Sequence, residues 1–256
     1  MRYALIFIKG IIRKCILKLL YSLIIISYFS SSVFAQEQTL EIVTEHWPPY
    51  IVQASDVKGE ISGIVTKKIK AIFDNTTLKY QITAYPWARS YYLAKTKPNT
   101  LIYSIYKTEQ RSKHFKWFCP IHDKTPVNIY KLKNNQTDIT NLISLENAIV
   151  GVLRNDNSHN YMLDKGFIEG KNLLVSSNEE NNIHHLLSGK IDAVIQSREA
   201  LLYRIKDSGL TIADFDIGFQ LHKEGNTEHC MALSNNSDPE LIKTVENAFN
   251  TWLKNK

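Results

Sequence analysis

TLIYSIY (residues 100–106) is a nearly continuous apolar run. Such a run predicts a central strand that is buried on both faces of a sheet. Upstream of it, two strand-like segments, LEIVT (40–44) and LKYQITAY (78–85), alternate with two helix-like segments, 63–75 and 87–95. This βαβαβ order predicts an α/β fold with a largely parallel sheet and helices on both of its faces.

A second series of the same kind follows. Strand-like segments at 126–132, 148–153, 172–177 and 191–196 alternate with helix-like segments at 158–166, 178–189 and 198–209. The C-terminal segment 237–256 has a capping residue in Ser237 or Asp238 and an apolar stripe at helical spacing, so it predicts a long helix. No flexible linker separates the two series. We therefore expect two α/β lobes that face each other, an arrangement that commonly binds a ligand between its domains.

The first 35 residues differ from the rest in composition. They carry basic but no acidic residues, followed by the apolar stretch LLYSLIIISYF and by SSSVFA. The small residues Val33 and Ala35 fit a signal-peptidase site, which predicts a signal peptide at 1–35 that is cleaved after Ala35. The apolar stretch is too short for a helix that spans a bilayer, although the long basic region leaves an uncleaved anchor open. We expect a periplasmic protein.

Without this leader, 26 basic residues stand against 25 acidic ones. A nearly neutral chain gives no reason to expect nucleic-acid binding. Two cysteines remain, Cys119 and Cys230. They would pair in an oxidising compartment, but both lie in apolar contexts that also suit buried thiols. The sequence does not decide between the two states.

The loop TEHWPPY (44–50) leaves the first strand through two prolines. Prolines end a strand and stiffen the backbone, so the loop predicts a rigid turn that carries Trp47 and Tyr50. These aromatic side chains either fold into the core or form one wall of a ligand site. PWARS (86–90) leaves the same alternatives for Trp87.

The segment YSIYKTEQRSKHF (103–115) holds the clearest candidate for binding chemistry. Thr108 is a good N-cap, which places Arg111 in the first turn of a helix. A cation there opposes the helix dipole, so Arg111 gains if an anion binds to its guanidinium and to the nearby backbone N–H groups. The alternative is a surface arginine paired with Glu109, and the segment by itself favours that alternative.

Five features occur in a fixed order along the chain: the first strand with EHWPPY, a glycine-led helix, T-x-x-R, F-x-W-F-x-P and G-K-x-D-A-V. With these features the chain resembles the bacterial extracellular solute-binding proteins of family 3, which are the periplasmic receptors of polar amino-acid ABC importers. The resemblance covers the chain from Leu40 to Trp252. It implies a two-lobed, periplasmic-binding-protein-like fold of type II and an inner-membrane ABC permease as partner. It also implies a first lobe at 36–126 and 228–256 and a second lobe at 127–227. We expect a monomer without a cofactor.

By the same resemblance, Arg111 would clamp a ligand carboxylate and Trp47 would stack on the ligand. Ser104 and Tyr106 would contact the ligand from the end of their strand. The other residues that we predict to bind ligand are Tyr50, Trp87, Thr108, Arg154, Asn155, Asp156, Asn157 and Ser197.

The chain also departs from the family pattern. The family often places an aspartate against the ligand amine five residues after the aspartate of D-A-V, where this chain has Ser197. The loop VLRNDNSH carries Asp156 where the family has glycine with threonine or serine. Asp156 would repel a carboxylate, and it is an alternative partner for an amine. The aspartate that is usual after the first glycine motif is missing from SGIVTKK. These departures argue against a standard α-amino acid as the ligand.

The sequence therefore predicts a periplasmic solute-binding protein that captures a small polar or anionic, amino-acid-like molecule between two lobes for ABC-type uptake. The main rival is a cleft enzyme of dehydratase or lyase type that uses Glu45 or His46 as acid or base. A third reading is a periplasmic sensor that signals instead of transporting. His184 and His185 point to different faces of one helix, so we expect no metal site.

Overall fold

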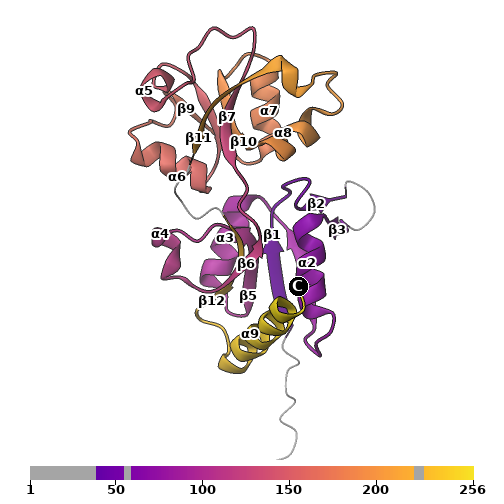
Figure 1. Ribbon diagram of the computed structural model, residues 1–256. Helices are drawn as coiled ribbons and strands as arrows, with labels where there is room; N and C mark the ends of the chain where they lie inside the picture. The colour runs from indigo at the N-terminus through magenta and orange to yellow at the C-terminus, as the bar shows by residue number, and fades with distance from the viewer. Residues whose placement is uncertain (1–38, 55–58, 222–227) are drawn as a thin grey trace, which may run out of the picture. The chain divides into compact units, whose positions relative to one another are not determined.

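The computed structural model describes residues 39–54, 59–221 and 228–256. The expected leader at 1–35, with its cleavage site, lies outside the described residues. The described chain forms two five-stranded sheets and a small two-stranded sheet (Figure 1). Helices flank each of the larger sheets, which confirms the expected α/β fold. We call each large sheet with its helices a lobe.

The first sheet has the strand order β4-β1-β5-β12-β6. Its strands are β1 (Leu40–Thr44), β4 (Tyr80–Ala84), β5 (Thr100–Ile105), β6 (Phe115–His122) and β12 (His229–Ser234). β1 pairs in parallel with β4 and β5, whereas β12 is antiparallel to both β5 and β6. β5, the apolar run that predicts a central strand, lies at the centre and every one of its residues is buried.

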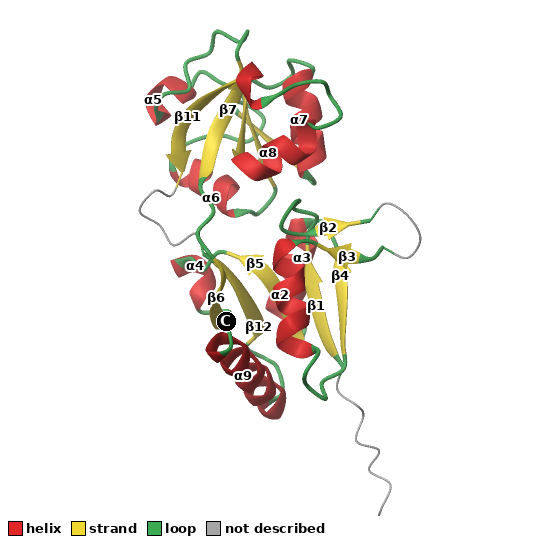
Figure 2. Cartoon of the chain, turned by 45° about the vertical axis from the view of Figure 1, so that its right-hand side comes forward, coloured by secondary structure: helices red, strands yellow, loops and turns green. Residues whose placement is uncertain are grey.

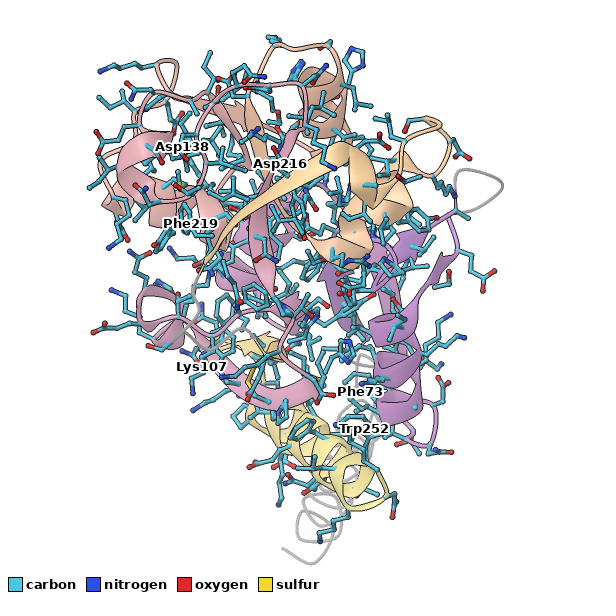
Figure 3. The ribbon with its side chains drawn as sticks, turned by 45° about the horizontal axis from the view of Figure 1, so that its top comes forward. Phe73, Lys107, Asp138, Asp216, Phe219 and Trp252 are labelled. Atoms are coloured by element: carbon cyan, nitrogen blue, oxygen red, sulfur yellow. A yellow bond between two sulfur atoms is a disulfide. The ribbon has the colours of Figure 1, made fainter. Side chains whose placement is uncertain are left out.

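Helices pack on both faces of the first sheet. Its helices are α2 (Ile64–Phe73), α3 (Trp87–Thr96), α4 (Glu109–Ser112) and α9 (Pro239–Lys254). Because strand side chains alternate between faces, Ile42 of β1 joins the core with α2 and α9, and Val43 joins the core with α3. Phe73 of α2 and Trp252 of α9, both labelled in Figure 3, belong to the first of these cores. The C-terminal helix thus completes the lobe that the N-terminal strands begin.

The second sheet has the strand order β11-β7-β10-β8-β9, and Figure 2 shows its neighbouring strands β11 and β7. Its strands are β7 (Val127–Leu132), β8 (Val150–Leu153), β9 (Leu173–Ser176), β10 (Ala193–Ser197) and β11 (Phe215–Leu221). β8 pairs in parallel with β9 and β10, and β7 is the antiparallel strand. The helices of this lobe are α5 (Leu142–Leu145), α6 (Asn157–Asp164), α7 (Glu179–Leu187) and α8 (Arg198–Ile205), with a 3₁₀ turn η1 (Ile212–Asp214). α7 and α8 pack on one face of the sheet, and α5 and α6 pack on the other.

The chain passes from the first sheet to the second between His122 and Val127, and it returns between Leu221 and His229. β7 is the first strand after the chain enters the second sheet, and β12 is the first strand after it returns to the first sheet. Each of these two strands runs antiparallel to both of its neighbours. In each sheet, the first strand after a crossing therefore lies second from the edge, between two antiparallel neighbours.

The aromatic loop after β1 is held by a short hairpin and by one glycine. Trp47 and Ile51 exchange two backbone hydrogen bonds across the turn that contains the prolines, and β2 (Val52–Gln53) then pairs with β3 (Ile61–Ser62). Gly63, at φ +110°, precedes α2, and a Cβ there would lie 2.5 Å from the carbonyl oxygen of Tyr50. Glycine is needed for this close approach.

Cys119 of β6 and Cys230 of β12 form a disulfide bond. The bond joins neighbouring strands of the first sheet and closes a loop with a sequence separation of 111 residues. Of the two states that the sequence leaves open, the structure has the paired one. No helix among the described residues is long and apolar enough to cross a membrane.

We predict that replacing both cysteines by serine lowers the free energy of unfolding by about 2–5 kcal/mol, because the long loop between them would no longer be restricted in the unfolded chain. Urea unfolding followed by tryptophan fluorescence measures this change. A reductant should lower the stability of the wild-type protein and leave the double variant unchanged. Equal midpoints for the oxidised wild type and the variant would contradict the prediction.

Candidate functional site

Residues of both lobes line one cavity of about 70 Å³. At about 10–15 Å³ for each water, it has room for roughly five waters or for part of a small solute. The cavity is lined by Glu45, Trp47, Trp87, Ser104, Tyr106, Arg111, Val127, Leu153, Asp156, Asn157, Ser158, Glu179, Ile195, Gln196 and Ser197.

The polar side chains of the cavity lie where parallel strands end. Glu45 follows β1, Tyr106 follows β5 and Ser197 is the last residue of β10. Asp156 and Glu179 lie shortly after β8 and β9. The carboxyl ends of parallel strands meet at one edge of a sheet, which is where open α/β sheets bind ligands. The polar residues of the site thus come from the carboxyl edge of the sheet in each lobe.

Arg111 is buried, with 3% of its surface exposed. Its Nη1 donates to the carbonyl of Tyr106 and its Nη2 to the carbonyl of Asn155, both at 3.3 Å. The guanidinium also lies 5.2 Å from the ring centroids of Trp87 and Tyr91. Thr108 caps its short helix by accepting from the Arg111 N–H, as predicted. The sequence segment favours a surface arginine paired with Glu109, and the burial of Arg111 shows that interpretation to be wrong.

Two donors from the first lobe converge on one carbonyl of the second lobe. Trp87 Nε1 donates to the Asn155 carbonyl at 2.8 Å, and Arg111 Nη2 donates to the same oxygen. Asn155 has φ +60°, a left-handed conformation that turns the loop after β8. Asparagine is among the few residues other than glycine that adopt this conformation easily. Asn155 therefore meets the first lobe through its main chain.

Ser104 is displaced from the regular strand by a β-bulge. In β12, Cys230 pairs with Ile105 and Met231 pairs with Tyr103, so Ser104 is the extra residue of β5. Its φ is +60°, which is uncommon for a residue other than glycine. Bulges redirect side chains beside functional sites. Here the bulge brings Ser104 to the cavity wall while its hydroxyl lies 3.0 Å from Nδ1 of His229.

Three partly buried acids share the cavity with Arg111. Burial raises the pKa of Glu45 well above its usual value, and the nearby Glu179 and Asp156 raise it further. Burial raises the pKa of Asp156 to about 6, although the His159 N–H donates to its carboxylate. Burial also raises the pKa of Glu179 to about 7. Three acids with raised pKa values therefore line the cavity beside Arg111, while Arg204 lowers the pKa of Glu45 and Glu179.

A second hollow of about 170 Å³ adjoins the first and shares Glu45, Trp87 and Glu179 with it. It also contains His46 and Glu180, whose side chains lie 3.7 Å apart. Glu180 lies 3.4 Å from Nε of Arg204. The acidic character of the first cavity thus continues into its neighbour.

Eight of the twelve residues predicted from the sequence line the cavity: Trp47, Trp87, Ser104, Tyr106, Arg111, Asp156, Asn157 and Ser197. The other four lie elsewhere. Tyr50 is buried beside Trp47 and donates to Glu199, and Thr108 caps α4. Asn155 acts through its carbonyl. Arg154 lines a different surface hollow of the second lobe.

Glu179 is the main cavity residue that sequence reasoning missed, and Glu45 entered only as part of the rival enzyme reading. Both come directly or shortly after a strand of a parallel set. A comparison of the polar residues that follow the parallel strands in both lobes would have identified Glu179 from the sequence. Among the described residues, no group of three or more histidine, cysteine or acidic side chains is arranged to hold a metal ion.

We predict that Glu179→Gln raises the melting temperature relative to wild type, by on the order of a few degrees at pH 8 and by much less at pH 5. The folded-state pKa of about 7 exceeds the usual 4.5, so the ionised carboxylate costs stability as pH rises between these values. Thermal unfolding between pH 5 and 8 measures the difference. Comparing variant with wild type at each pH cancels the opposite effect of His229, whose pKa burial lowers to about 3.

The matched control is Glu246→Gln on the exposed face of α9, which should show no such trend. A Glu179→Gln difference that stays constant across this range would contradict the assignment of a raised pKa to Glu179.

Comparisons with known proteins agree with this geometry. Among solved structures, a histidine kinase sensor domain with similarity to periplasmic binding proteins has a TM-score of 0.72 and 17% identity, over 86% of this chain and 92% of that one. An ancestral arginine-binding protein bound to arginine has a TM-score of 0.70 and 20% identity, over 85% and 93%.

A substrate-binding protein of an amino acid ABC transporter from Streptococcus pneumoniae, bound to L-arginine, has a TM-score of 0.67 and 20% identity, over 86% and 90% of the two chains. Similarity at this level of identity establishes the two-lobed fold. No curated protein sequence matches the chain. The model of one family, bacterial extracellular solute-binding proteins, family 3, matches residues 40–256. The chain therefore belongs to the family 3 extracellular solute-binding proteins.

Proposed function

We propose that this protein captures a small solute that carries at least one ammonium or guanidinium group. The observation that supports this proposal is the charge of the cavity, where the partly buried acids Glu45, Asp156 and Glu179 lie with the buried Arg111. Buried like charges repel one another and take up protons. A cationic ligand offsets this repulsion, so each carboxylate that ionises beside the bound cation adds to the binding free energy.

Arg111 gives the ligand a second requirement. Two of its donors are used by main-chain carbonyls, and a guanidinium has five N–H donors in total. The remaining donors suit a carboxylate, which a guanidinium binds through paired hydrogen bonds. A solute with both a carboxylate and an extra positive charge, such as a basic amino acid, satisfies Arg111 and the acids together. This proposal narrows the expected small polar or anionic, amino-acid-like ligand to an amino-acid-like solute that carries an additional positive charge.

The other cavity residues have matching roles in the proposal. Trp47 and Trp87 supply apolar walls for the carbon chain of the solute. Tyr106 has a buried hydroxyl without a hydrogen-bond partner among the described residues, and it lines the cavity. A buried hydroxyl without a partner is costly, so a ligand group that bonds it adds affinity. The adjoining hollow, with Glu180 and His46, has room for the far end of an extended cationic solute.

We place this activity outside the cytoplasm, with an inner-membrane ABC permease as the partner. Three observations support that placement: membership of an extracellular family, similarity to a substrate-binding protein of an amino acid ABC transporter, and the disulfide bond. Disulfides persist in oxidising compartments.

The proposal keeps the lobe boundaries near residues 126 and 228 and treats the protein as a monomer. A role as a ligand sensor is the second candidate, because a histidine kinase sensor domain has the same fold.

The first test is a thermal-shift screen with L-arginine, L-lysine, L-ornithine, putrescine, L-glutamate and L-glutamine. A ligand present at one hundred times its dissociation constant adds about 2.7 kcal/mol of stability. We expect the three basic amino acids to raise the melting temperature and L-glutamate to leave it unchanged. A shift with L-glutamate alone would contradict the proposal.

The recovered solute should be chemically unchanged after incubation with the protein. Conversion of the solute, lost in Glu45→Gln, would favour the rival enzyme reading instead.

The second test uses Arg111→Gln, which we expect to weaken L-arginine binding on the order of 100-fold, because a charge-assisted pair of hydrogen bonds to the carboxylate is lost. Binding of putrescine, which has no carboxylate, should be unaffected or tighter in the same variant. Calorimetric titration measures both affinities. Equal losses for the two solutes would show that Arg111 maintains the cavity and does not bind the carboxylate.

A further inference from the structure

Glu179 lines both the cavity and the adjoining hollow, and two side-chain amides of its own lobe hold its carboxylate. Asn182 Nδ2 donates to Oε2 of Glu179 at 3.0 Å, and Gln196 Nε2 donates to the same oxygen at 2.6 Å. Glu179 is partly buried, whereas Asn182 is completely buried and Gln196 is 3% exposed. One oxygen of the carboxylate is thus fixed by two groups that are packed in the interior.

The two amides come from two elements that pack against each other. Glu179 and Asn182 lie three residues apart on α7, so they share one face of that helix. Gln196 lies in β10, and residues of α7 and β10 belong to one apolar core. Regular secondary structure, and not a loop, therefore sets the position of Oε2.

Asn182 is not the side chain that the core alone would favour. Its Oδ1 is buried and has no hydrogen-bond partner among the described residues, which lowers stability. Gly151 of β8 leaves room for this amide, since a Cβ there would lie 3.1 Å from Oδ1 of Asn182 and 2.6 Å from Cδ1 of Ile191. The Asn182 amide thus acts through its hydrogen bond to Glu179.

The free oxygen of Glu179 decides which cation it suits. An ionised carboxylate has about two lone-pair positions on each oxygen. Asn182 and Gln196 take both positions on Oε2, whereas Oε1 has no hydrogen bond to a described residue. A guanidinium binds a carboxylate best through two parallel N–H bonds, one to each oxygen. An ammonium is a compact charge, for which a single oxygen is enough.

We propose that Asn182 and Gln196 are positioning residues that hold Glu179 as a single-oxygen acceptor, and that Glu179 thereby selects an ammonium group over a guanidinium group. This inference rests on the proposed function, because it names the cation of the solute that Glu179 takes. Among basic amino acids it favours L-lysine and L-ornithine over L-arginine. The other two acids of the cavity, Glu45 and Asp156, attract both kinds of cation, so the preference arises at Glu179.

The test removes one amide donor at a time and nearly keeps the size of the side chain. Gln196→Met and Asn182→Leu each free one lone-pair position on Oε2, which opens Glu179 to a paired contact with a guanidinium. The control for Gln196 is Gln220→Met on β11, because both glutamines lie opposite Asn128 of β7 but Gln220 is outside the cavity lining. The control for Asn182 is Asn181→Leu, on the exposed face of α7.

The first readout needs no ligand. Carboxyl ¹³C NMR of the full chain with labelled glutamate follows the titration of Glu179, whose signal is the one that disappears in Glu179→Gln. Burial raises the pKa of Glu179 to about 7 in the wild type. A donated hydrogen bond favours the ionised carboxylate, so loss of either donor should raise this pKa further.

Both controls should leave the pKa of Glu179 unchanged. Asp156, Glu180 and Arg204 also act on this pKa, and they are the same in every variant. An unchanged pKa of Glu179 in Gln196→Met or in Asn182→Leu would overturn the positioning role of that amide.

The second readout is the ratio of the affinities for L-lysine and L-arginine by calorimetry. We expect the wild type and both controls to bind L-lysine more tightly. The preference for L-lysine should fall on the order of tenfold in Gln196→Met and in Asn182→Leu, because the guanidinium gains a second hydrogen bond to Glu179.

Tighter binding of L-arginine by the wild type, or a ratio that changes in neither variant, would overturn the selectivity. If the wild type binds neither amino acid, the proposed function and the selectivity both fail, whereas the NMR titration still decides whether the two amides hold Glu179.

Discussion

Electrostatic repulsion among Glu45, Asp156 and Glu179 is the interaction on which the binding cleft depends. Glu45 belongs to the first lobe, and Asp156 and Glu179 belong to the second, so the repulsion acts between lobes as well as within one. Under the proposed function, a cationic solute between these carboxylates would replace their mutual repulsion by attraction to the ligand, so residues of both lobes would contribute to its binding.

Among the described residues that line the cavity, Arg111 is the one basic side chain. Burial lowers the pKa of its guanidinium below the usual range, but an arginine stays protonated in proteins. The rings of Trp87 and Tyr91 and two main-chain carbonyls surround it. Because the cation does not titrate, the charge of the site changes with pH only through the acids. The net charge of the site therefore depends on the protonation of Asp156 and Glu179, whose pKa values are about 6 and 7.

Much of the fold could be predicted from apolar runs and capping residues. The central strand at 100–106, the helix after Pro86 and the C-terminal helix all appear close to their expected positions. The sequence pattern did not predict β6 as a strand, because Pro120 interrupts it, and a proline is tolerated there only since β6 is an edge strand. β11 and the fully buried β12 were missed as well.

The candidate site was less predictable, for physical reasons. Arg111 and Trp47 follow from residue type and position, but the burial of Arg111 depends on the second lobe. Asn155 takes part through its carbonyl, which no side-chain pattern encodes. The bulge at Ser104 arises from pairing with β12, which is distant in sequence, so local reasoning could not find it.

The disulfide between Cys119 and Cys230 has a mechanical consequence for the first lobe. It joins β6, the last strand before the chain passes to the second sheet, to β12, the first strand after the chain returns. The covalent link therefore keeps these two strands from separating, so a pull on the second lobe is borne by a cross-linked strand pair and not by backbone hydrogen bonds alone.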